Sequence, residues 1–151
     1  MSIFYGHVLK PILFQFNPDT VHNFFITVGE FAGRFKILRW FFGLFYNYRG
    51  ADISKTVDGI TYRTPVILAA GFDPDGRLTQ ILPSFSFGGE EIGSVSARPS
   101  EGNPKPHFTR LIRNKSIVVY KGLKNKGVDA LISKFSSNPV DGGKSLLIKL
   151  I

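Results

Sequence analysis

One continuous apolar segment, residues 65–71, constrains the fold of this chain more than any other feature. Its sequence is Pro-Val-Ile-Leu-Ala-Ala-Gly, without a polar side chain. A strand with one solvated face alternates apolar and polar residues, whereas an unbroken apolar run is typical of a strand buried on both faces of a parallel sheet. We expect a second strand at residues 91–95 and a helix at residues 75–82 between the two strands. This order predicts a parallel α/β unit.

The first fifty residues have a helical pattern instead. Asn17 can cap a helix, Pro18 suits its first position, and apolar residues recur on one face as far as residue 35. Two shorter amphipathic segments, 4–14 and 35–46, flank this helix, and lysine and arginine border their aromatic residues. Such faces either pack on the rest of the protein or lie in the headgroup region of a membrane, and the sequence leaves both interpretations open.

Beyond residue 50 the pattern changes to short strands. Asp58 and Gly59 form a dipeptide that favours a two-residue hairpin turn. Further elements are expected in chain order: a hairpin with strands at 108–112 and 116–120, a helix at 128–135 and a last apolar strand at 145–151. The change of pattern predicts two domains, residues 1–49 and residues 50–151.

The charge of the chain predicts a negatively charged partner. Lysine and arginine number 19 against 11 acidic residues, which gives a net charge of +8. A phosphate, a small acid, a lipid headgroup or a nucleic acid would each satisfy this charge. The basic cluster Lys121, Lys124 and Lys126 lacks the interleaved aromatic residues of nucleic-acid motifs, so no nucleic-acid partner is expected.

Several kinds of site are excluded or disfavoured by composition and spacing. The absence of cysteine excludes a disulfide scaffold, a thiol nucleophile and a thiolate zinc site. His7, His22 and His107 lie far apart, so no metal is expected. Gly143-Lys144-Ser145 resembles the end of a nucleotide-binding P-loop, but Asn138 stands where that loop requires its first glycine. No secretory signal or membrane-spanning segment is visible.

Successive motifs of the chain resemble those of dihydroorotate dehydrogenase, in the same order and with the same spacing. They are residues 65–73 (PVILAAGFD), 91–96 (EIGSVS), 102–106 (GNPKP) and 122–127 (GLKNKG). Residues 16–22 (FNPDTVH) resemble the helical extension of the membrane-associated, quinone-dependent class (class 2) of that family. The chain is thereby identified as resembling the N-terminal part of such an enzyme.

The resemblance implies an α/β fold, a partial (β/α)8 TIM barrel with about three of its eight strands, preceded by a small N-terminal helical domain. Residues 1–49 would be the extension on the membrane and quinone side, and residues 50–151 the N-terminal portion of an FMN-binding barrel. The implied activity is that of a flavoprotein oxidoreductase of pyrimidine (UMP) biosynthesis, which oxidises dihydroorotate to orotate and reduces a quinone. The implied location is peripheral, on the cytoplasmic membrane or the mitochondrial inner membrane.

The resemblance also assigns site residues. Its cofactor contacts would fall on Ala70, Gly71, Phe72, Asp73 and Ser94. Its substrate contacts would fall on Pro74, Val119, Tyr120, Lys121, Gly122 and Leu123. His22 and Arg110 match positions that line the quinone tunnel of the family. The serine that acts as catalytic base is expected beyond Ile151, so the chain by itself is expected to be inactive.

The chain departs from the family pattern at two substrate positions. Pro74 stands where the family has a lysine that touches flavin and substrate, and Val119 stands where an asparagine binds orotate. Lys121 is the nearest alternative cation in the sequence. These departures leave a second interpretation open, namely a non-catalytic or truncated relative that keeps the scaffold without the activity.

Overall fold

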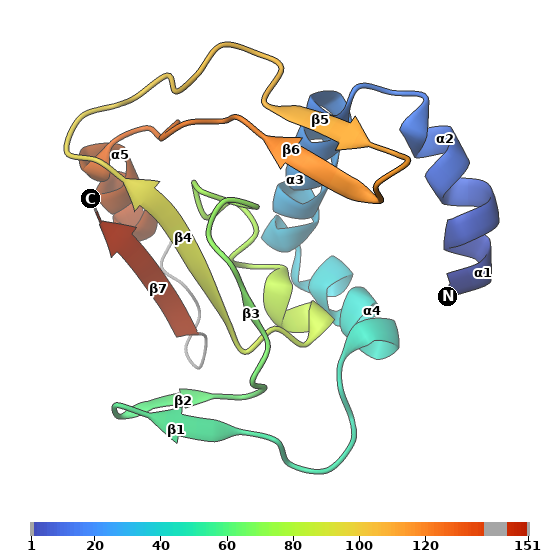
Figure 1. Ribbon diagram of the computed structural model, residues 1–151. Helices are drawn as coiled ribbons and strands as arrows, with labels where there is room; N and C mark the ends of the chain where they lie inside the picture. The colour runs from blue at the N-terminus through green and yellow to red at the C-terminus, as the bar shows by residue number, and fades with distance from the viewer. Residues whose placement is uncertain (1, 138–144, 151) are drawn as a thin grey trace.

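The computed structural model describes residues 2–137 and 145–150, and Figure 1 traces its elements along the chain. The helical elements are α1 (Ser2–Phe4), the π-helical turn η1 (Tyr5–Leu9), α2 (Lys10–Phe14), α3 (Pro18–Arg34), α4 (Lys36–Tyr46), the 3-10 helix η2 (Leu82–Phe85) and α5 (Val128–Ser137). The strands are β1 (Lys55–Val57), β2 (Ile60–Tyr62), β3 (Ile67–Leu68), β4 (Gly89–Val95), β5 (Phe108–Leu111), β6 (Ser116–Val119) and β7 (Ser145–Leu150). This combination confirms the α/β class.

A parallel sheet with the order β3-β4-β7 forms the centre of the fold. The predicted parallel arrangement is therefore confirmed. The last predicted strand is present over Ser145–Leu150, whereas residue 151 and residues 143 and 144 of the P-loop-like segment lie outside the described residues. Helix α5 lies beside β4 in Figure 1, and Leu131 of this helix packs against Ile92 and Val95 of the strand in a buried cluster.

Both predicted hairpins are confirmed. Strands β1 and β2 pair antiparallel, and Asp58 and Gly59 between them have φ angles of +50° and +77°, as a type I′ turn requires. Strands β5 and β6 pair from Phe108 opposite Val119 to Leu111 opposite Ser116, so each strand is one residue shorter than predicted. This second hairpin follows β4 and precedes α5 along the chain, and Figure 1 shows it close to α3.

The N-terminal helices begin and end close to the predicted positions. The Asn17 side chain accepts a hydrogen bond from the Asp19 backbone N–H, and Pro18 is the first residue of α3. Ile26 and Ala32 of α3 share a buried cluster with Leu78, Ile81 and Leu82. The helical segment is therefore packed on the segment between β3 and β4, and the domain boundary near residue 50 stays a prediction.

The predicted helix at residues 75–82 is wrong. Residues 70–81 form a series of turns, and the helical segment η2 begins only at Leu82. Gly76 has a φ of +59°, and the Asp73 carboxylate accepts a hydrogen bond from the Leu78 backbone N–H. A left-handed glycine and a side chain that bonds the nearby backbone both compete with helical hydrogen bonding.

The predicted burial of residues 65–71 on both faces is also wrong. Only Ile67 and Leu68 pair as a strand, and the side chains of Val66 and Ile67 are 54% and 39% exposed. Among the described strands, β3 pairs only with β4 and lies at the edge of the sheet. Side chains of a strand are buried on both faces only where other elements pack on both faces of the sheet, and the described residues do not cover Val66 and Ile67 in this way.

Candidate functional site

A cavity of about 350 Å³ lies where β3 and β4 end. Its lining comes from the turn after β3, the end of β4, the loop before β5 and the segment after β6: Ala70, Gly71, Pro74, Gly93, Ser94, Asn103, Val119, Tyr120, Lys121, Gly122, Leu123 and Lys124. Carboxyl ends of neighbouring parallel strands lie at the same edge of a sheet, which is where ligands of α/β folds bind. The cavity joins Ala70, Gly71 and Ser94 to all six predicted substrate residues.

The strand ends leave their backbone open to this cavity. Gly71 has a φ of +103°, and a methyl group added there would meet no atom within 4 Å. Ala70 beside it carries only a methyl group. Because no larger side chain covers these residues, a flat ring can approach their peptide groups closely.

The segments before β5 and after β6 approach each other through glycine. The Asn103 backbone N–H donates a hydrogen bond of 3.1 Å to the Lys121 carbonyl. A methyl group on Gly122 would lie 2.9 Å from the Asn103 nitrogen, and one on Gly102 would collide with the Lys121 carbonyl oxygen. Both glycines also have positive φ angles, +70° at Gly102 and +67° at Gly122. These two positions therefore require glycine.

Asn125 is a structural residue of the site that the sequence analysis did not single out. Its Oδ1 accepts hydrogen bonds from the backbone N–H groups of Gly127 (2.9 Å) and Ser96 (3.3 Å). Its Nδ2 donates to the Leu123 carbonyl at 2.7 Å. The buried Asn125 thus ties the predicted substrate segment to the end of β4. The sequence signal that could have identified Asn125 is its position between Gly122 and Gly127 of the GLKNKG motif.

Lys121 brings a cation to a cavity in which the two positions that depart from the family pattern carry none. Pro74 and Val119 offer no polar side chain, and the Lys124 ammonium pairs with Glu101 at 3.1 Å. Burial lowers the pKa of Lys121, although the negative charges of the Asp75, Asp73 and Asp19 carboxylates act in the opposite direction. Its Nζ lies 5.9 Å from the centre of the Phe108 ring. Lys121 can therefore meet an anionic ligand in the cavity.

Phe72 and Asp73 are not among the residues that line the cavity. The Phe72 ring meets the His22 ring edge-on, with centroids 5.0 Å apart. Asp73 is 2% exposed, and its carboxylate bonds the Leu78 backbone N–H. The structure thus gives Asp73 a role in shaping the turn that follows β3.

The two predicted quinone residues each join the helical segment to another part of the fold. His22 packs between Phe72 and Phe108, and burial followed by the charge of Lys121 lowers its pKa. Arg110 donates a 2.7 Å hydrogen bond to the Phe16 carbonyl, and its guanidinium lies 4.5 Å over the Phe14 ring. Arg110 lines a groove of about 650 Å³ between the N-terminal helix and the β5–β6 hairpin, whereas His22 is not among the residues that line this groove.

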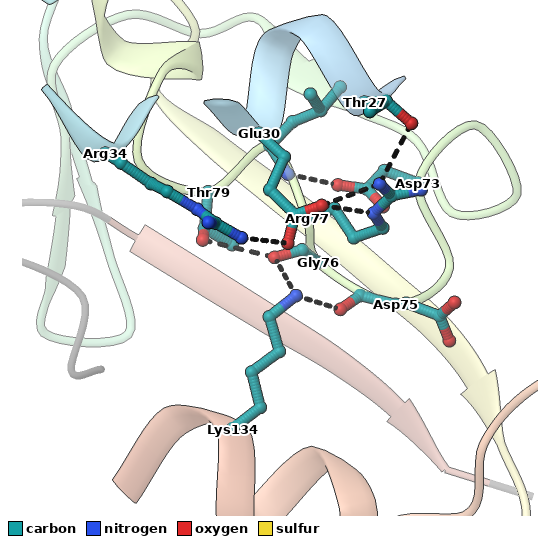
Figure 2. A network of polar contacts seen from close by, with 10 residues as sticks. Thr27, Glu30, Arg34, Asp73, Asp75, Gly76, Arg77, Thr79 and Lys134 are labelled. Atoms are coloured by element: carbon teal, nitrogen blue, oxygen red, sulfur yellow. Dashed lines mark hydrogen bonds and ion pairs between the residues drawn. The ribbon is translucent and has the colours of Figure 1, made fainter. Parts of the chain in front are cut away.

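A polar network holds the turn after β3 from two sides, as Figure 2 shows. Arg77 donates hydrogen bonds to Glu30 (2.7 Å) and Thr27 (3.1 Å) of α3. From α5, the Lys134 ammonium donates to the carbonyls of Asp75 (2.7 Å) and Gly76 (2.8 Å). Sequence reasoning missed this network because its partners lie far apart along the chain.

Glu90 on β4 is a second buried carboxyl close to Asp73 of this turn. Glu90 is 3% exposed, and neither carboxyl oxygen has a hydrogen-bond partner among the described residues. Burial, and next the nearby Asp73 carboxylate, raise the pKa of Glu90 to about 9, against the opposing charge of Lys134. Glu90 is therefore a neutral acid in the folded protein at pH 7.

A buried contact between His107 and Asp19 joins α3 to the loop that carries Asn103. The His107 Nδ1 lies 3.3 Å from the Asp19 Oδ1, and the His107 backbone N–H donates to Oδ2 at 3.2 Å. The His107 Nε2 lies 3.0 Å from the Asn103 carbonyl oxygen. The first turn of α3 thereby fixes one wall of the cavity.

The sequence pattern of the dihydroorotate dehydrogenase family matches residues 52–141. A relative from Christiangramia forsetii, named dihydroorotate dehydrogenase (quinone), is 33% identical over 138 residues, which cover 89% of this chain and 39% of that protein. Relatives of the same name from Nitrosospira multiformis and Cellvibrio japonicus are 34% and 35% identical, over 37% and 39% of their lengths. The chain thus spans about two fifths of the length of these relatives.

Solved structures of DHODH are also similar to this chain. A crystal structure of DHODH from Eimeria tenella, in complex with ferulenol, has a TM-score of 0.58 and 25% sequence identity and covers 80% of this chain and 35% of that one. The ligand-free structure from the same organism has a TM-score of 0.54, with 26% identity.

Proposed function

The chain belongs to the dihydroorotate dehydrogenase family, and from this premise we propose that it supplies the flavin-facing and substrate-facing segments of an FMN-dependent oxidoreductase. The proposed reaction is the oxidation of dihydroorotate to orotate in pyrimidine biosynthesis. The proposed acceptor is a quinone, in keeping with relatives that are named dihydroorotate dehydrogenase (quinone).

The observation that carries this proposal is the shared cavity. Three residues matched to flavin contacts, Ala70, Gly71 and Ser94, line the same 350 Å³ space as the segment matched to substrate contacts. A flavin and its substrate must touch for a hydride to pass between them. Residues that are about 25 to 50 positions apart in the sequence supply the two sides of this space.

The residues present fit an FMN ring. The open space over Gly71 leaves peptide groups accessible, and small side chains at Ala70 and Ser94 leave room for a flat group. The Ser94 hydroxyl can donate or accept a hydrogen bond at its edge. When bound there, FMN would supply the chemistry of hydride acceptance.

The role of Lys121 in this proposal is to bind the substrate carboxylate. Orotate and dihydroorotate are anions, and a partly buried anion without a cationic or hydrogen-bonding partner is costly. A lysine ammonium that donates to a carboxylate makes a charge-assisted hydrogen bond. Asn103, whose backbone N–H bonds the Lys121 carbonyl, also lines the cavity and adds an amide that can orient the same ligand.

The departures at Pro74 and Val119 support a second candidate function. Both residues line the cavity, and neither side chain can donate a hydrogen bond to orotate. In this alternative the protein is a non-catalytic relative that keeps the scaffold and the cofactor-facing backbone. Binding of FMN without oxidation of dihydroorotate would distinguish it from the first candidate.

We also propose a peripheral location on a membrane, with the N-terminal helices on the membrane and quinone side. Large apolar side chains are exposed along these helices, among them Phe4, Phe24, Phe31, Trp40 and Phe45. No helix within the described residues is both long and apolar enough to cross a bilayer. His22 and Arg110 connect this helical segment to the rest of the fold, through Phe72 and through the β5 strand.

Titration of the chain with FMN, followed by quenching of flavin fluorescence, tests the cofactor proposal. Gly71→Ala should weaken FMN binding at least about tenfold, because a methyl group would occupy the space over the backbone and strain the positive φ. Gly59→Ala is the matched control, since Gly59 also has a positive φ and open space but lies in the β1–β2 turn. Equal effects of the two changes, or no saturable binding, would contradict the proposal.

A further inference from the structure

A second cavity, of about 410 Å³, carries arginine side chains from three parts of the chain. Arg39 comes from α4, Arg49 from the segment that follows α4, and Arg63 from the segment that follows β2. No acidic side chain is among the described residues that line this cavity. It is separate from the cavity at the ends of β3 and β4, with which it shares no lining residue.

The described contacts of two of these arginines leave donors for a ligand. Arg49 donates through Nη2 to the Leu44 carbonyl at 3.1 Å, and Arg63 donates through Nη2 to the Asn47 side-chain oxygen at 2.9 Å. These contacts orient each guanidinium and use one nitrogen of each group. A guanidinium has five N–H donors in a planar fork that matches the oxygens of a phosphate.

An apolar stripe begins at the edge of the same cavity. Trp40 and Leu44 of α4 line the cavity, and Ile37, Phe41 and Phe45 continue the exposed apolar face of this helix. Trp40 is 64% exposed and Phe45 is 68% exposed. The opposite side of α4 is covered, because Leu38 and Phe42 pack on the buried cluster of Ile26, Leu78 and Ile81. Figure 1 shows α4 at the outside of the fold.

Arginines beside an exposed tryptophan and an apolar helical stripe are the chemistry of a membrane interface. Aromatic residues lie at the headgroup level, and apolar side chains of a surface helix enter the boundary with the acyl chains. Each basic residue near an anionic surface adds attraction to the lipid phosphates. A free phosphate would use the arginines alone and would leave the stripe exposed.

We propose that Arg49 and Arg63, with Arg39 beside them, bind the phosphate of an anionic phospholipid headgroup while the α4 stripe enters the bilayer surface. This inference rests on the proposed membrane contact and places it at α4. The occupant is a lipid bilayer with anionic headgroups, and the contact includes Arg63, which lies beyond the helical segment in the sequence.

Trp40 makes the proposal testable without a label, because it is the one tryptophan of the chain. Vesicles of phosphatidylglycerol and phosphatidylcholine should shift its emission to shorter wavelength, and vesicles of phosphatidylcholine alone should shift it much less. Arg49→Gln with Arg63→Gln should weaken partition to the anionic vesicles about tenfold or more. Arg98→Gln with Arg113→Gln is the matched control, since both residues are exposed, lie outside this cavity and change the net charge equally.

The results of these experiments distinguish failure of the phosphate site from failure of the membrane contact. Equal losses in the two double variants would overturn the phosphate site and leave only general electrostatic attraction. No response of Trp40 to any vesicle, with FMN binding intact, would overturn both this inference and the membrane contact while the cofactor proposal stands. A response of Trp40 to inorganic phosphate that equals the response to vesicles would assign the cavity to a free anion instead. Far-ultraviolet circular dichroism of each variant establishes that the fold is retained.

Discussion

At the scale of single residues, burial of the Glu90 carboxyl makes the stability of the fold depend on pH. Its folded pKa of about 9 lies above the ordinary value of 4.5. The unfolded chain therefore releases this proton at lower pH than the folded protein does. The favourable contribution of the neutral acid is fully present below pH 4.5 and is lost as the pH rises toward 9.

Replacement of this acid by an apolar residue should remove the pH dependence. We expect Glu90→Leu to raise the free energy of unfolding at pH 8 by about 1–3 kcal/mol, because it removes a buried polar group without a partner. Denaturant unfolding at pH 5 and at pH 8 measures the effect, which should be smaller at pH 5. Glu91→Leu, at the neighbouring and less buried position, is the control. A loss of stability at both pH values for Glu90→Leu would contradict the assignment.

Lys121 should carry the affinity of the cavity for orotate. Lys121→Ala is expected to weaken orotate binding to the FMN-loaded protein by about 1.5–3 kcal/mol, the usual range for loss of a charge-assisted hydrogen bond. Pro74→Lys in the same background should restore part of this loss, since Pro74 lines the same cavity. Titration followed by flavin absorbance gives both values. Lys124→Ala, whose ammonium pairs with Glu101, is the control.

The pH dependence of this binding has a definite sign. Burial lowers the pKa of Lys121, so its ammonium loses its proton at lower pH than an exposed lysine does. Orotate binding should therefore weaken as the pH is raised into the alkaline range, and the Lys121→Ala variant should not show this change. An identical pH profile in the two proteins would exclude Lys121 as the orotate cation.

Individual site residues were predictable only where a short motif surrounds them. Ala70, Gly71 and Ser94 lie in motifs that resemble those of the family, and all three line the cavity. The contacts of Arg77 with Glu30 and of Lys134 with the turn carry no such local signal. They arise from tertiary packing of segments that are distant in sequence.

At the scale of elements, the two loops around the cavity depend on close approach at glycine. Gly122→Ala should lower the free energy of unfolding by about 1–3 kcal/mol, because the added methyl would lie 2.9 Å from the Asn103 nitrogen at a positive φ. Gly43→Ala in α4, where a methyl meets nothing within 4 Å, should instead stabilise the helix by up to about 1 kcal/mol. Thermal unfolding of the two variants compares the effects, and shifts of the same sign would refute the argument.

The errors of the sequence analysis concern the elements between the strands. Apolar periodicity at residues 75–82 favours a helix, but Leu78, Ile81 and Leu82 reach the buried cluster from turns and from a 3-10 helix. Apolar periodicity indicates which residues are buried, but it does not indicate which backbone hydrogen bonds those residues make. The buried Asp73 side chain and the left-handed Gly76 decide the backbone path here.

At the scale of the whole molecule, strand direction was more predictable than burial. The apolar run at residues 65–71 and the strand at 91–95 predicted a parallel pair, a further apolar run predicted a strand at 145–151, and β3, β4 and β7 are parallel. The exposure of Val66 and Ile67 could not be predicted from these runs, because burial depends on which neighbours a strand has. The eight-stranded barrel remains an expectation from the family, since the chain spans about two fifths of the length of the relatives it matches.

The proposed flavin site is tested most directly by mapping FMN onto the chain through the backbone amide signals of the isotope-labelled protein. We expect saturable shifts at Gly71, Ser94 and Gly122, which line one cavity, and none at Gly59 in the β1–β2 turn, which does not line it. Addition of orotate to the FMN-loaded protein should then shift Lys121 and Asn103 further. Shifts that spare Gly71 and Ser94, or that gather at Arg49 and Arg63 around the second cavity, would contradict a flavin site at the ends of β3 and β4.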